Sequence, residues 1–232
     1  MTFADQALGF VKDGTVIGLG TGRAATLFVE ALGRKVREGL QVRGVPTSAS
    51  TAKLAGGLGI PLTTLDEVDE LDATFDGADE VSPDLDLIKG YGGALVREKI
   101  VAASSKRLII LVGPGKEVPK LGGRGRLPIE VIPFGLSLVN RRLAKLGLFG
   151  EIRSVPHPTG FETTELIPFR TDNGNLILDC RSGPIDDPAA LERALHDIPG
   201  VVDTGLFLGM AETVLIGHDD GSVQVRHRGE SA

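Results

Sequence analysis

Residues 15–38 read TVIGLGTGRAATLFVEALGRKVRE and combine a short apolar segment, a glycine-rich turn and a longer amphipathic segment. Thr15–Leu19 is short and rich in apolar and β-branched residues, which is typical of a buried strand. In Ala24–Glu38 the apolar side chains recur at helical spacing, which predicts an amphipathic helix. The stretch therefore predicts a strand, a tight turn at Gly18–Arg23 and a helix.

The same order of elements continues through the first half of the chain. Alternating strands and helices favour a parallel sheet, because a parallel connection needs a crossover that is usually a helix. We therefore expect an α/β fold with a doubly wound, mainly parallel, Rossmann-like sheet. Its further elements are predicted as strands at Gln41–Val45, Leu71–Phe75 and Arg107–Val112, and helices at Ala49–Leu58 and Ala94–Ser104.

A second unit is predicted after the polar, glycine-rich bridge Gly122–Arg126. We expect residues 126–204 to form a smaller α+β domain of the ferredoxin or ACT type, and residues 1–125 with 205–232 to form the Rossmann-like domain. In Thr171–Gly174, Asn-Gly tolerates positive φ, which predicts a hairpin turn. The predicted elements are strands Pro128–Ile132, Glu151–Val155, Glu165–Phe169 and Asn175–Cys180, helices Phe134–Leu146 and Pro188–Ile198, and returning strands Glu212–Ile216 and Ser222–Arg226.

Composition narrows the classes of function. The chain has 232 residues, a net charge of −6 and no Trp, so it offers none of the basic surface that nucleic acid binding requires. The single cysteine, Cys180, cannot form an internal disulfide and is expected to be a buried, inert thiol. The sequence has no signal-like N-terminus and no apolar run near the ~20 residues that cross a bilayer. We expect a cytoplasmic protein without membrane or nucleic acid partners.

Chemistry is expected after the predicted strands, because ligands of open α/β sheets gather at the carboxyl ends of the strands. The corner Gly18–Arg23 ends one strand and opens a helix, so its N–H groups, the helix dipole and the Thr21 hydroxyl could hold a phosphate. Dinucleotide binding is disfavoured because Arg23 occupies the last glycine position of Gly-x-Gly-x-x-Gly. A tight turn without a ligand stays a second reading of this corner.

A second corner, Asp76-Gly77-Ala78-Asp79-Glu80, places several carboxylates directly after a predicted strand. A metal site is disfavoured because no histidine lies nearby and the oxygen ligands lack the spacing of a calcium loop. Acid–base work on hydroxyls and a helix N-cap with solvated acids both remain open. Lys89, Glu98 and Lys116, the last in a third corner, could each equally be a solvated surface charge.

These motifs together resemble ribose-5-phosphate isomerase of the A type. The resemblance implies reversible conversion of D-ribose 5-phosphate into D-ribulose 5-phosphate through an enediolate, in the non-oxidative pentose phosphate pathway. It implies no metal and no organic cofactor, and a homodimer or homotetramer. The segments that carry it are Gly18–Gly22, Gly44–Ser48, Asp76–Glu80, Leu87–Gly90, Gly92–Ala94, Arg97–Ile100, Pro128–Pro133, Asp172–Asn175, Pro199–Val202, Gly205–Phe207 and Gly209–Ala211.

The resemblance also assigns roles by position. Glu98 falls at the general base, Lys89 at the cation that stabilises the enediolate, and Asp76 and Asp79 at the paired carboxylates that help ring opening. Lys116 matches a substrate-binding lysine. The implied substrate-binding segments comprise Thr21, Gly22, Arg23 and Ala24, then Asp76, Gly77, Ala78 and Asp79, and finally Lys89, Gly90, Tyr91 and Gly92.

This chain departs from the family pattern in two places. Arg23-Ala24 replaces a Ser-Thr pair that is common in the family, which removes two hydroxyls and adds a guanidinium. Arg23 could bind phosphate bidentately, or it could equally be a solvated or interface residue. Tyr91 interrupts a run that is commonly all glycine. It could stiffen the loop or line the sugar pocket, or be a surface aromatic.

Two other classes of function compete with the isomerase. A phosphosugar sensor of a transcription regulator would need a DNA-binding module, and no helix-turn-helix segment is expected before Thr15. An amino-sugar-phosphate isomerase/deaminase or a coenzyme A transferase would share the broad fold. The combination of Asp76, Asp79, Lys89 and Glu98 favours the ribose enzyme.

Overall fold

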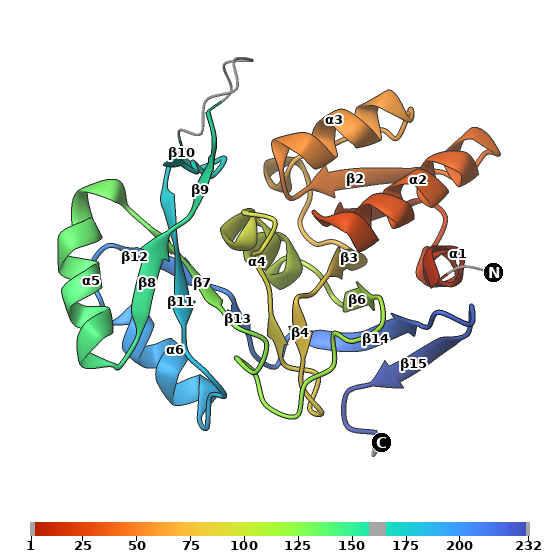
Figure 1. Cartoon of the computed structure of the whole chain (residues 1–232). Coiled ribbons are helices and arrows are strands. Elements are labelled where there is room, and N and C mark those ends of the chain that lie inside the picture. Colours follow the sequence, from red (N-terminus) through yellow and green to blue (C-terminus); the bar gives the residue numbers. More distant parts are fainter. Residues whose placement is uncertain (1–2, 158–165, 231–232) are drawn as a thin grey trace.

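The computed structural model describes residues 3–157 and 166–230, and its main sheet is six-stranded with the order β15-β14-β6-β3-β1-β2 (Figure 1). All neighbouring strands in this sheet are parallel except the terminal pair of β14 and β15. This confirms the α/β class and the mainly parallel sheet. The strands are β1 (Thr15–Leu19), β2 (Val42–Pro46), β3 (Ala73–Gly77), β6 (Leu108–Val112), β14 (Ala211–Gly217) and β15 (Val223–His227).

Helices cover both faces of this sheet (Figure 1). The apolar run of β6 is fully buried, and its alternate residues enter different cores: Ile109 and Leu111 pack with Phe28 of α2, whereas Ile110 packs with Ala102 of α4. A strand buried on both faces needs a continuous apolar run, which is what this segment supplies. The helices are α1 (Phe3–Ala7), α2 (Arg23–Arg37), α3 (Ala49–Gly57) and α4 (Leu95–Ala103), with short turns η1 (Leu8–Phe10) and η2 (Leu65–Glu67).

A second, four-stranded antiparallel sheet has the order β12-β7-β11-β8. Along the chain its elements follow the order βαββαβ, and Val139 and Leu143 of α5 and Leu195 of α6 share a core with the strands. The elements are β7 (Leu127–Val131), η3 (Pro133–Gly135), α5 (Leu136–Lys145), β8 (Phe149–Ile152), β11 (Leu176–Arg181), α6 (Pro188–His196) and β12 (Val201–Thr204).

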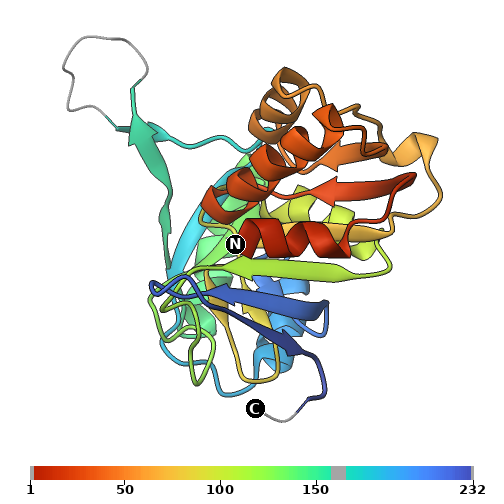
Figure 2. The same ribbon diagram turned by 90° about the vertical axis from the view of Figure 1, so that its right-hand side faces the viewer.

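Two small sheets complete the fold. The pair β9 (Ser154–Pro156) and β10 (Leu166–Pro168) projects beyond the four-stranded antiparallel sheet, as Figure 2 shows. A three-stranded sheet of β13 (Leu206–Phe207), β5 (Leu87–Ile88) and β4 (Glu80–Val81) lies between the two large sheets (Figure 1). It brings the segment before Lys89 next to the returning chain, where the Lys89 N–H donates to Gly205 O at 2.9 Å.

The structure confirms some of the sequence expectations and corrects others. The tail does return to the main sheet, since β14 lies between β6 and β15, and Cys180 is buried as expected. The turn at Thr171–Gly174 is confirmed, because Gly174 N donates to Thr171 O at 2.9 Å, Thr171 N donates to Asn175 O at 3.0 Å and Gly174 has φ +80°. The flanking strands do not extend it into a longer hairpin, because β10 pairs with β9 and β11 pairs with β7 and β8. A helix after Asp76–Glu80 is wrong, because β4 follows. Glu165, the first residue of one expected strand, lies outside the described residues.

Candidate active site

A cavity of about 650 Å³ opens where β1, β3 and β6 end. Its wall includes every expected site residue except Asp76, which lies buried directly behind it with 1% exposure. Residues far apart in sequence thus meet at one place because the carboxyl ends of parallel strands share one edge of the sheet. The expected residues on the wall are Thr21, Gly22, Arg23, Ala24, Gly77, Ala78, Asp79, Lys89, Gly90, Tyr91, Gly92, Glu98 and Lys116.

The first glycine corner fits against Asp76. A Cβ at Gly20 would lie 2.2 Å from Asp76 Oδ1, so only glycine allows this approach. Thr21 N donates to the same carboxylate oxygen at 3.1 Å. Gly22 has φ +108°, which L side chains rarely adopt, and it precedes α2. The corner therefore presents the start of a 15-residue helix to the cavity, a place where N–H groups and the helix dipole favour an anion.

The Thr21 hydroxyl belongs to a buried hydroxyl network. Thr21 Oγ1 donates to Ser48 Oγ at 2.7 Å and lies 2.8 Å from Thr47 Oγ1. Thr51 Oγ1 closes the network by donating to Gly20 O at 2.9 Å. Thr47, Ser48 and Thr51 were given no role from the sequence, although the segment Gly44–Ser48 was among those that carried the resemblance. The network fixes the corner after β1 to the start of α3.

Asp76, Lys89 and Glu98 form a buried ionic cluster that we call the cavity cluster. Lys89 Nζ lies 3.0 Å from Asp76 Oδ2 and 3.3 Å from Glu98 Oε2, and all three side chains are 1–3% exposed. Lys89 Nζ also donates to Gly77 O. Asp76 Oδ1 accepts from Gly77 N at 2.7 Å. Among residues 3–157 and 166–230, no group donates a hydrogen bond of good geometry to Asp76 Oδ2 or Glu98 Oε2, so each depends on the charge of Lys89.

Burial and mutual repulsion set the protonation of this cluster. Burial raises the pKa of Glu98, the Asp76 carboxylate raises it further, and the Lys89 ammonium lowers it, with a net pKa of about 8. Burial likewise raises the pKa of Asp76, against the influence of Lys89. For Lys89, burial lowers the pKa but the two carboxylates outweigh burial and raise it overall. The ammonium therefore stays charged while Glu98 can gain or lose a proton near neutral pH.

Asp79 and Lys116 occupy another part of the wall. Asp79 Oδ2 accepts from Tyr91 N at 2.9 Å, and Asp79 Oδ1 lies 3.8 Å from Lys116 Nζ. Lys116 is about one-third exposed. This pair joins the second and third corners, and it places a carboxylate and a cation where hydroxyl groups of a bound polyol could meet them.

The two residues that depart from the family pattern have different surroundings. Arg23 is exposed at the cavity mouth as the first residue of α2. The Tyr91 hydroxyl donates to Arg126 O at 3.2 Å, and the Arg126 guanidinium carbon lies 4.4 Å from the centroid of the Tyr91 ring. Tyr91 therefore lines the cavity while its ring is held by the second unit, so the interpretation as a free surface aromatic is wrong.

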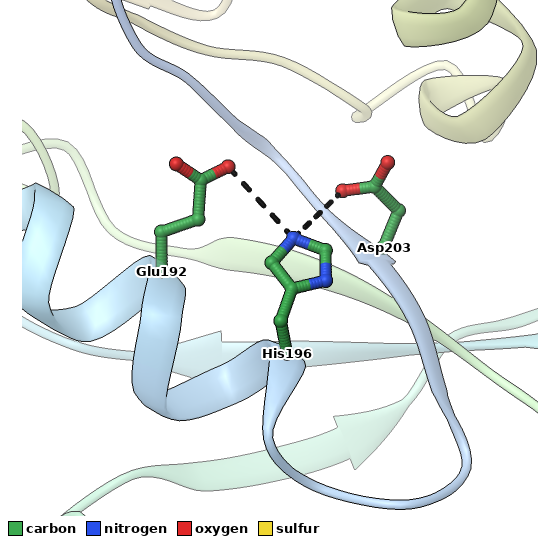
Figure 3. A group of neighbouring side chains, drawn as sticks. All are labelled: Glu192, His196 and Asp203. Atoms are coloured by element: carbon green, nitrogen blue, oxygen red, sulfur yellow. Dashed lines mark ion pairs between the residues drawn. The ribbon is translucent and has the colours of Figure 1, made fainter.

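Outside the cavity, the described residues contain one further group of possible metal ligands, Glu192, His196 and Asp203 (Figure 3). His196 Nε2 lies 3.4 Å from Asp203 Oδ1 and 3.9 Å from Glu192 Oε1. Lys99 Nζ lies 3.3 Å from Glu192 Oε1 and 2.5 Å from Asp203 Oδ1. The Lys99 ammonium therefore already balances the negative charge of these two carboxylates, as a metal cation would. Lys99, Glu192 and Asp203 form what we call the outer cluster.

The geometry of the cavity cluster suits one kind of chemistry. A carboxylate with a pKa near the working pH can take a proton from carbon, and a fixed ammonium beside it can stabilise the oxyanion that results. The start of α2, where N–H groups and the helix dipole favour an anion, lies on the same wall. The arrangement can therefore hold a phosphorylated, hydroxyl-rich substrate and move a proton next to its carbonyl group.

Comparison with known proteins agrees with this chemistry. The family profile described as "Ribose 5-phosphate isomerase A (phosphoriboisomerase A)" matches residues 43–221. Ribose-5-phosphate isomerase A from Roseiflexus castenholzii is 50% identical over 225 residues, which cover 96% of this chain and 92% of the relative. The protein of the same name from Bradyrhizobium diazoefficiens is 49% identical over 229 residues, covering 97% and 94%.

Solved structures give the same result. Ribose 5-phosphate isomerase A from Methanocaldococcus jannaschii superposes with a TM-score of 0.88 at 42% identity, over 97% of this chain and 96% of the other. A D-ribose-5-phosphate isomerase in complex with phospho-erythronic acid gives a TM-score of 0.89 at 39% identity, over 97% and 96%. Profile, sequence and structure agree over nearly the whole chain, and the chain belongs to the ribose 5-phosphate isomerase A family.

Proposed function

We propose that this chain interconverts D-ribose 5-phosphate and D-ribulose 5-phosphate through an enediolate intermediate. The observation that carries the proposal is the Glu98 carboxylate with its pKa raised to about 8, held 3.3 Å from a buried lysine on the cavity wall. Membership of the family supports the same reaction. A related enzyme was solved with phospho-erythronic acid, a phosphorylated sugar acid, which supports a phosphosugar as the occupant of this cavity.

Substrate binding is proposed to begin at the phosphate. The start of α2, with Thr21, Gly22 and Ala24, offers main-chain N–H groups and the positive end of a helix dipole. Arg23 adds a guanidinium that can reach a phosphate bidentately. Lys116 adds a second cation on the wall. The hydroxyl-rich part of the sugar then extends toward Asp79 and the cavity cluster.

Ring opening requires a proton to leave the hydroxyl on C1 and another to reach the ring oxygen. Asp79 lies on the cavity wall beside Lys116 and is proposed to accept the proton of the C1 hydroxyl and to return it to the ring oxygen as the bond between C1 and that oxygen breaks. Asp76, behind the wall, holds Lys89 at 3.0 Å. Its proposed part is to keep the ammonium in place and, through that ammonium, to exchange protons with the oxygens of the open chain, because its own carboxylate does not line the cavity.

The isomerisation itself is proposed to use Glu98 as the base. Its carboxylate takes the proton from C2 of the open aldose, and the electron pair of that C–H bond forms the C1–C2 double bond of the enediolate. Lys89 stabilises the negative charge that develops on O1. Glu98 then returns the proton to C1, the hydroxyl proton moves from O2 to O1, and the product is the ketose.

The proposal is tested by assaying the purified chain with D-ribose 5-phosphate in the presence of EDTA. We expect full turnover with EDTA, and solvent deuterium in ribulose 5-phosphate at C1 when the reaction runs in D₂O. Loss of activity with EDTA would overturn the metal-free mechanism. Turnover of glucosamine 6-phosphate or of a coenzyme A thioester, in place of ribose 5-phosphate, would overturn the substrate.

The wider setting of the enzyme is also a proposal. We place it in the non-oxidative branch of the pentose phosphate pathway in the cytoplasm; none of the described helices has the length and apolar character needed to cross a membrane. We further propose a homodimer or homotetramer, because Phe134, Phe149 and Leu166 of the second unit are 101%, 71% and 64% exposed. A monomer by sedimentation analysis would overturn this assembly.

The two-domain division is kept as a proposal as well. Residues 1–125 with 205–232 would form the catalytic unit, and residues 126–204 a unit of the ferredoxin or ACT type. The strand order β12-β7-β11-β8 and the βαββαβ sequence of elements support it. Expression of residues 126–204 alone, followed by circular dichroism and thermal melting, tests whether this unit folds cooperatively.

A further inference from the structure

Arg153, which joins β8 to β9 in the second unit, contacts the loop that carries Lys89. Arg153 Nη1 donates to Gly90 O at 2.8 Å and to Tyr91 O at 3.1 Å. The same guanidinium binds Asp179 on β11 through both remaining nitrogens, Nε at 2.9 Å and Nη2 at 2.5 Å. The Arg153 and Asp179 side chains are only 10% and 11% exposed. A single guanidinium thus connects the second sheet to the substrate loop.

The Arg153 contact bears on the backbone of this loop, whereas the Arg126 contact described above holds the Tyr91 side chain. Gly90 has φ +108° and Gly93 has φ +86°, so the segment Gly90–Gly93 has the backbone freedom of glycine at both ends. On the cavity side, the loop is held where Tyr91 N donates to Asp79 Oδ2 at 2.9 Å. On the other side, Arg153 binds the carbonyl oxygen of that same peptide unit, Gly90 O, and the carbonyl oxygen of the next unit, Tyr91 O. The loop is therefore held between a carboxylate and a guanidinium.

Arg153 does not belong to the active-site cavity. It lines a separate hollow of about 560 Å³, which shares Tyr91 with the cavity. Its influence on substrate must therefore pass through the backbone of Gly90 and Tyr91, directly after Lys89. Neither the sequence pattern nor the family resemblance singled out Arg153 or Asp179.

We propose that Arg153, oriented by Asp179, is a positioning residue for the isomerisation: it fixes the Gly90–Tyr91 backbone and so holds Lys89 against Glu98. The inference rests on the proposed function. Lys89 is the residue before the clamped backbone, and its ammonium must stay 3.3 Å from Glu98. A guanidinium suits this task, because its planar fork can bind a carboxylate bidentately and still donate to carbonyl oxygens, which one ammonium cannot do in the same geometry.

The experiment compares Arg153→Ala and Arg153→Lys with the matched control Arg181→Ala. Arg181 lies two residues after Asp179 on β11, lines the same hollow, and pairs with Glu151 at 3.6 Å in an exposed position. We expect kcat/KM of Arg153→Ala to fall about tenfold to a hundredfold, because small misplacements of substrate-positioning groups carry costs of that size. Arg153→Lys should recover part of the loss, and Arg181→Ala should match wild type.

Two readouts separate positioning from a general structural role. The acidic limb of the Arg153→Ala pH–rate profile should move to higher pH, because a displaced Lys89 no longer lowers the pKa of Glu98. The Tyr91 amide should exchange with D₂O faster in Arg153→Ala than in wild type, since its loop is released from one side. Arg181→Ala should show neither change.

The proposal is overturned if Arg153→Ala folds, keeps the wild-type acidic limb and exchanges the Tyr91 amide at the wild-type rate. It is also overturned if Arg181→Ala causes equal changes, because that result would mean a general effect of the hollow. Should Arg153→Ala fail to fold, Arg153→Met replaces it, since it keeps the aliphatic stem and removes the guanidinium alone; Asp179 is left unchanged because it also pairs with Arg126 at 3.2 Å. If wild type does not isomerise ribose 5-phosphate, the proposed function fails, while amide exchange still decides whether Arg153 holds the loop.

Discussion

Two clusters of charged side chains meet at α4, which contributes Glu98 to one and Lys99 to the other. They have the same composition and differ in environment. Each places one ammonium between two carboxylates, and both Lys89 Nζ and Lys99 Nζ lie over the Phe207 ring, 5.5 Å and 5.0 Å from its centroid. Glu98 of the cavity cluster and Lys99 of the outer cluster are adjacent in sequence. The cavity cluster is Asp76, Lys89 and Glu98, and the outer cluster is Lys99, Glu192 and Asp203.

The difference lies in solvent and hydrogen bonding. The side chains of the cavity cluster are 1–3% exposed, and two of its carboxylate oxygens lack a hydrogen bond of good geometry. The side chains of the outer cluster are 14–24% exposed. Only the cavity cluster borders the active-site cavity. A lysine between two carboxylates is therefore common to both clusters, and burial beside the cavity is what distinguishes the cavity cluster.

The largest expected effect is on turnover when the corresponding glutamates are changed. Glu98→Gln removes the proposed base while keeping shape, so we expect kcat to fall about 10³- to 10⁴-fold, toward the upper range for general base catalysis. Glu192→Gln removes a carboxylate from the outer cluster and should keep most of the turnover. Initial rates with ribose 5-phosphate measure both. Comparable rates for wild type and Glu98→Gln would remove Glu98 as the base.

The second-largest expected effect is on turnover when the lysine of each cluster is changed. Lys89→Met keeps the aliphatic stem and removes the charge that would stabilise the enediolate, so we expect about a 10²- to 10³-fold loss in kcat, the size seen when one oxyanion donor is lost. Lys99→Met is the matched control, since Lys99 contacts the same ring but not the cavity. Equal losses in the two variants would mean that the ring contact, and not the charge at the cavity, determines activity.

The main sheet and the turn at Gly18–Arg23 could be predicted from sequence because they depend on local patterns. The apolar run of β6 and the glycines around β1 determine conformation over a few neighbouring residues. The strands β4, β5 and β13 were missed because two residues carry no periodicity. The turn at Thr171–Gly174 could be predicted from Asn-Gly, but its anchor could not, because that anchor is distant in sequence: Glu130 Oε1 accepts from Thr171, Asn173 and Asn175 at 2.8–3.0 Å.

Of the residues at or near the candidate active site, some also had a signal in the sequence and others had none. Glu98 stands between Arg97 and Lys99 and reads as a surface residue, yet it shares a buried face of α4 with Leu95 and Ala102. Its spacing of three and four residues from them was the available signal, since a charged residue on an apolar helix face is seldom accidental. Only the family resemblance gave it a role. Arg153 had no comparable signal, because its partners lie 26 or more residues away.

A third prediction concerns the pH dependence of the cavity cluster. Burial and then the Asp76 charge raise the pKa of Glu98 to about 8, so kcat/KM should rise with pH through that value as the carboxylate forms. Asp76→Asn keeps an oxygen for the N–H groups of Thr21 and Gly77 but removes the charge, and the acidic limb should move to lower pH. A limb that stays in place, or moves upward, would mean that Asp76 does not influence the proton on Glu98.

The smallest expected effect is on stability. Glu98 has a folded-state pKa of about 8 against a usual value of 4.5, so folding favours its neutral form. Its contribution to stability is complete below 4.5 and is lost as pH rises through 8. The melting temperature of Glu98→Gln relative to wild type should therefore increase between those pH values and then level off.

Thermal melts of Glu98→Gln at a series of pH values from about 4 to 9 follow this change. Glu192→Gln is melted in parallel as the control for loss of a carboxylate next to a lysine. A constant difference between Glu98→Gln and wild type across the series would mean that burial of Glu98 costs no stability when it ionises. A growing difference would mean that the cavity cluster is held in an ionised form that the fold itself disfavours. That outcome would support the proposed role of Glu98 as a base, because a carboxylate that costs stability when it ionises is explained by chemistry and not by folding.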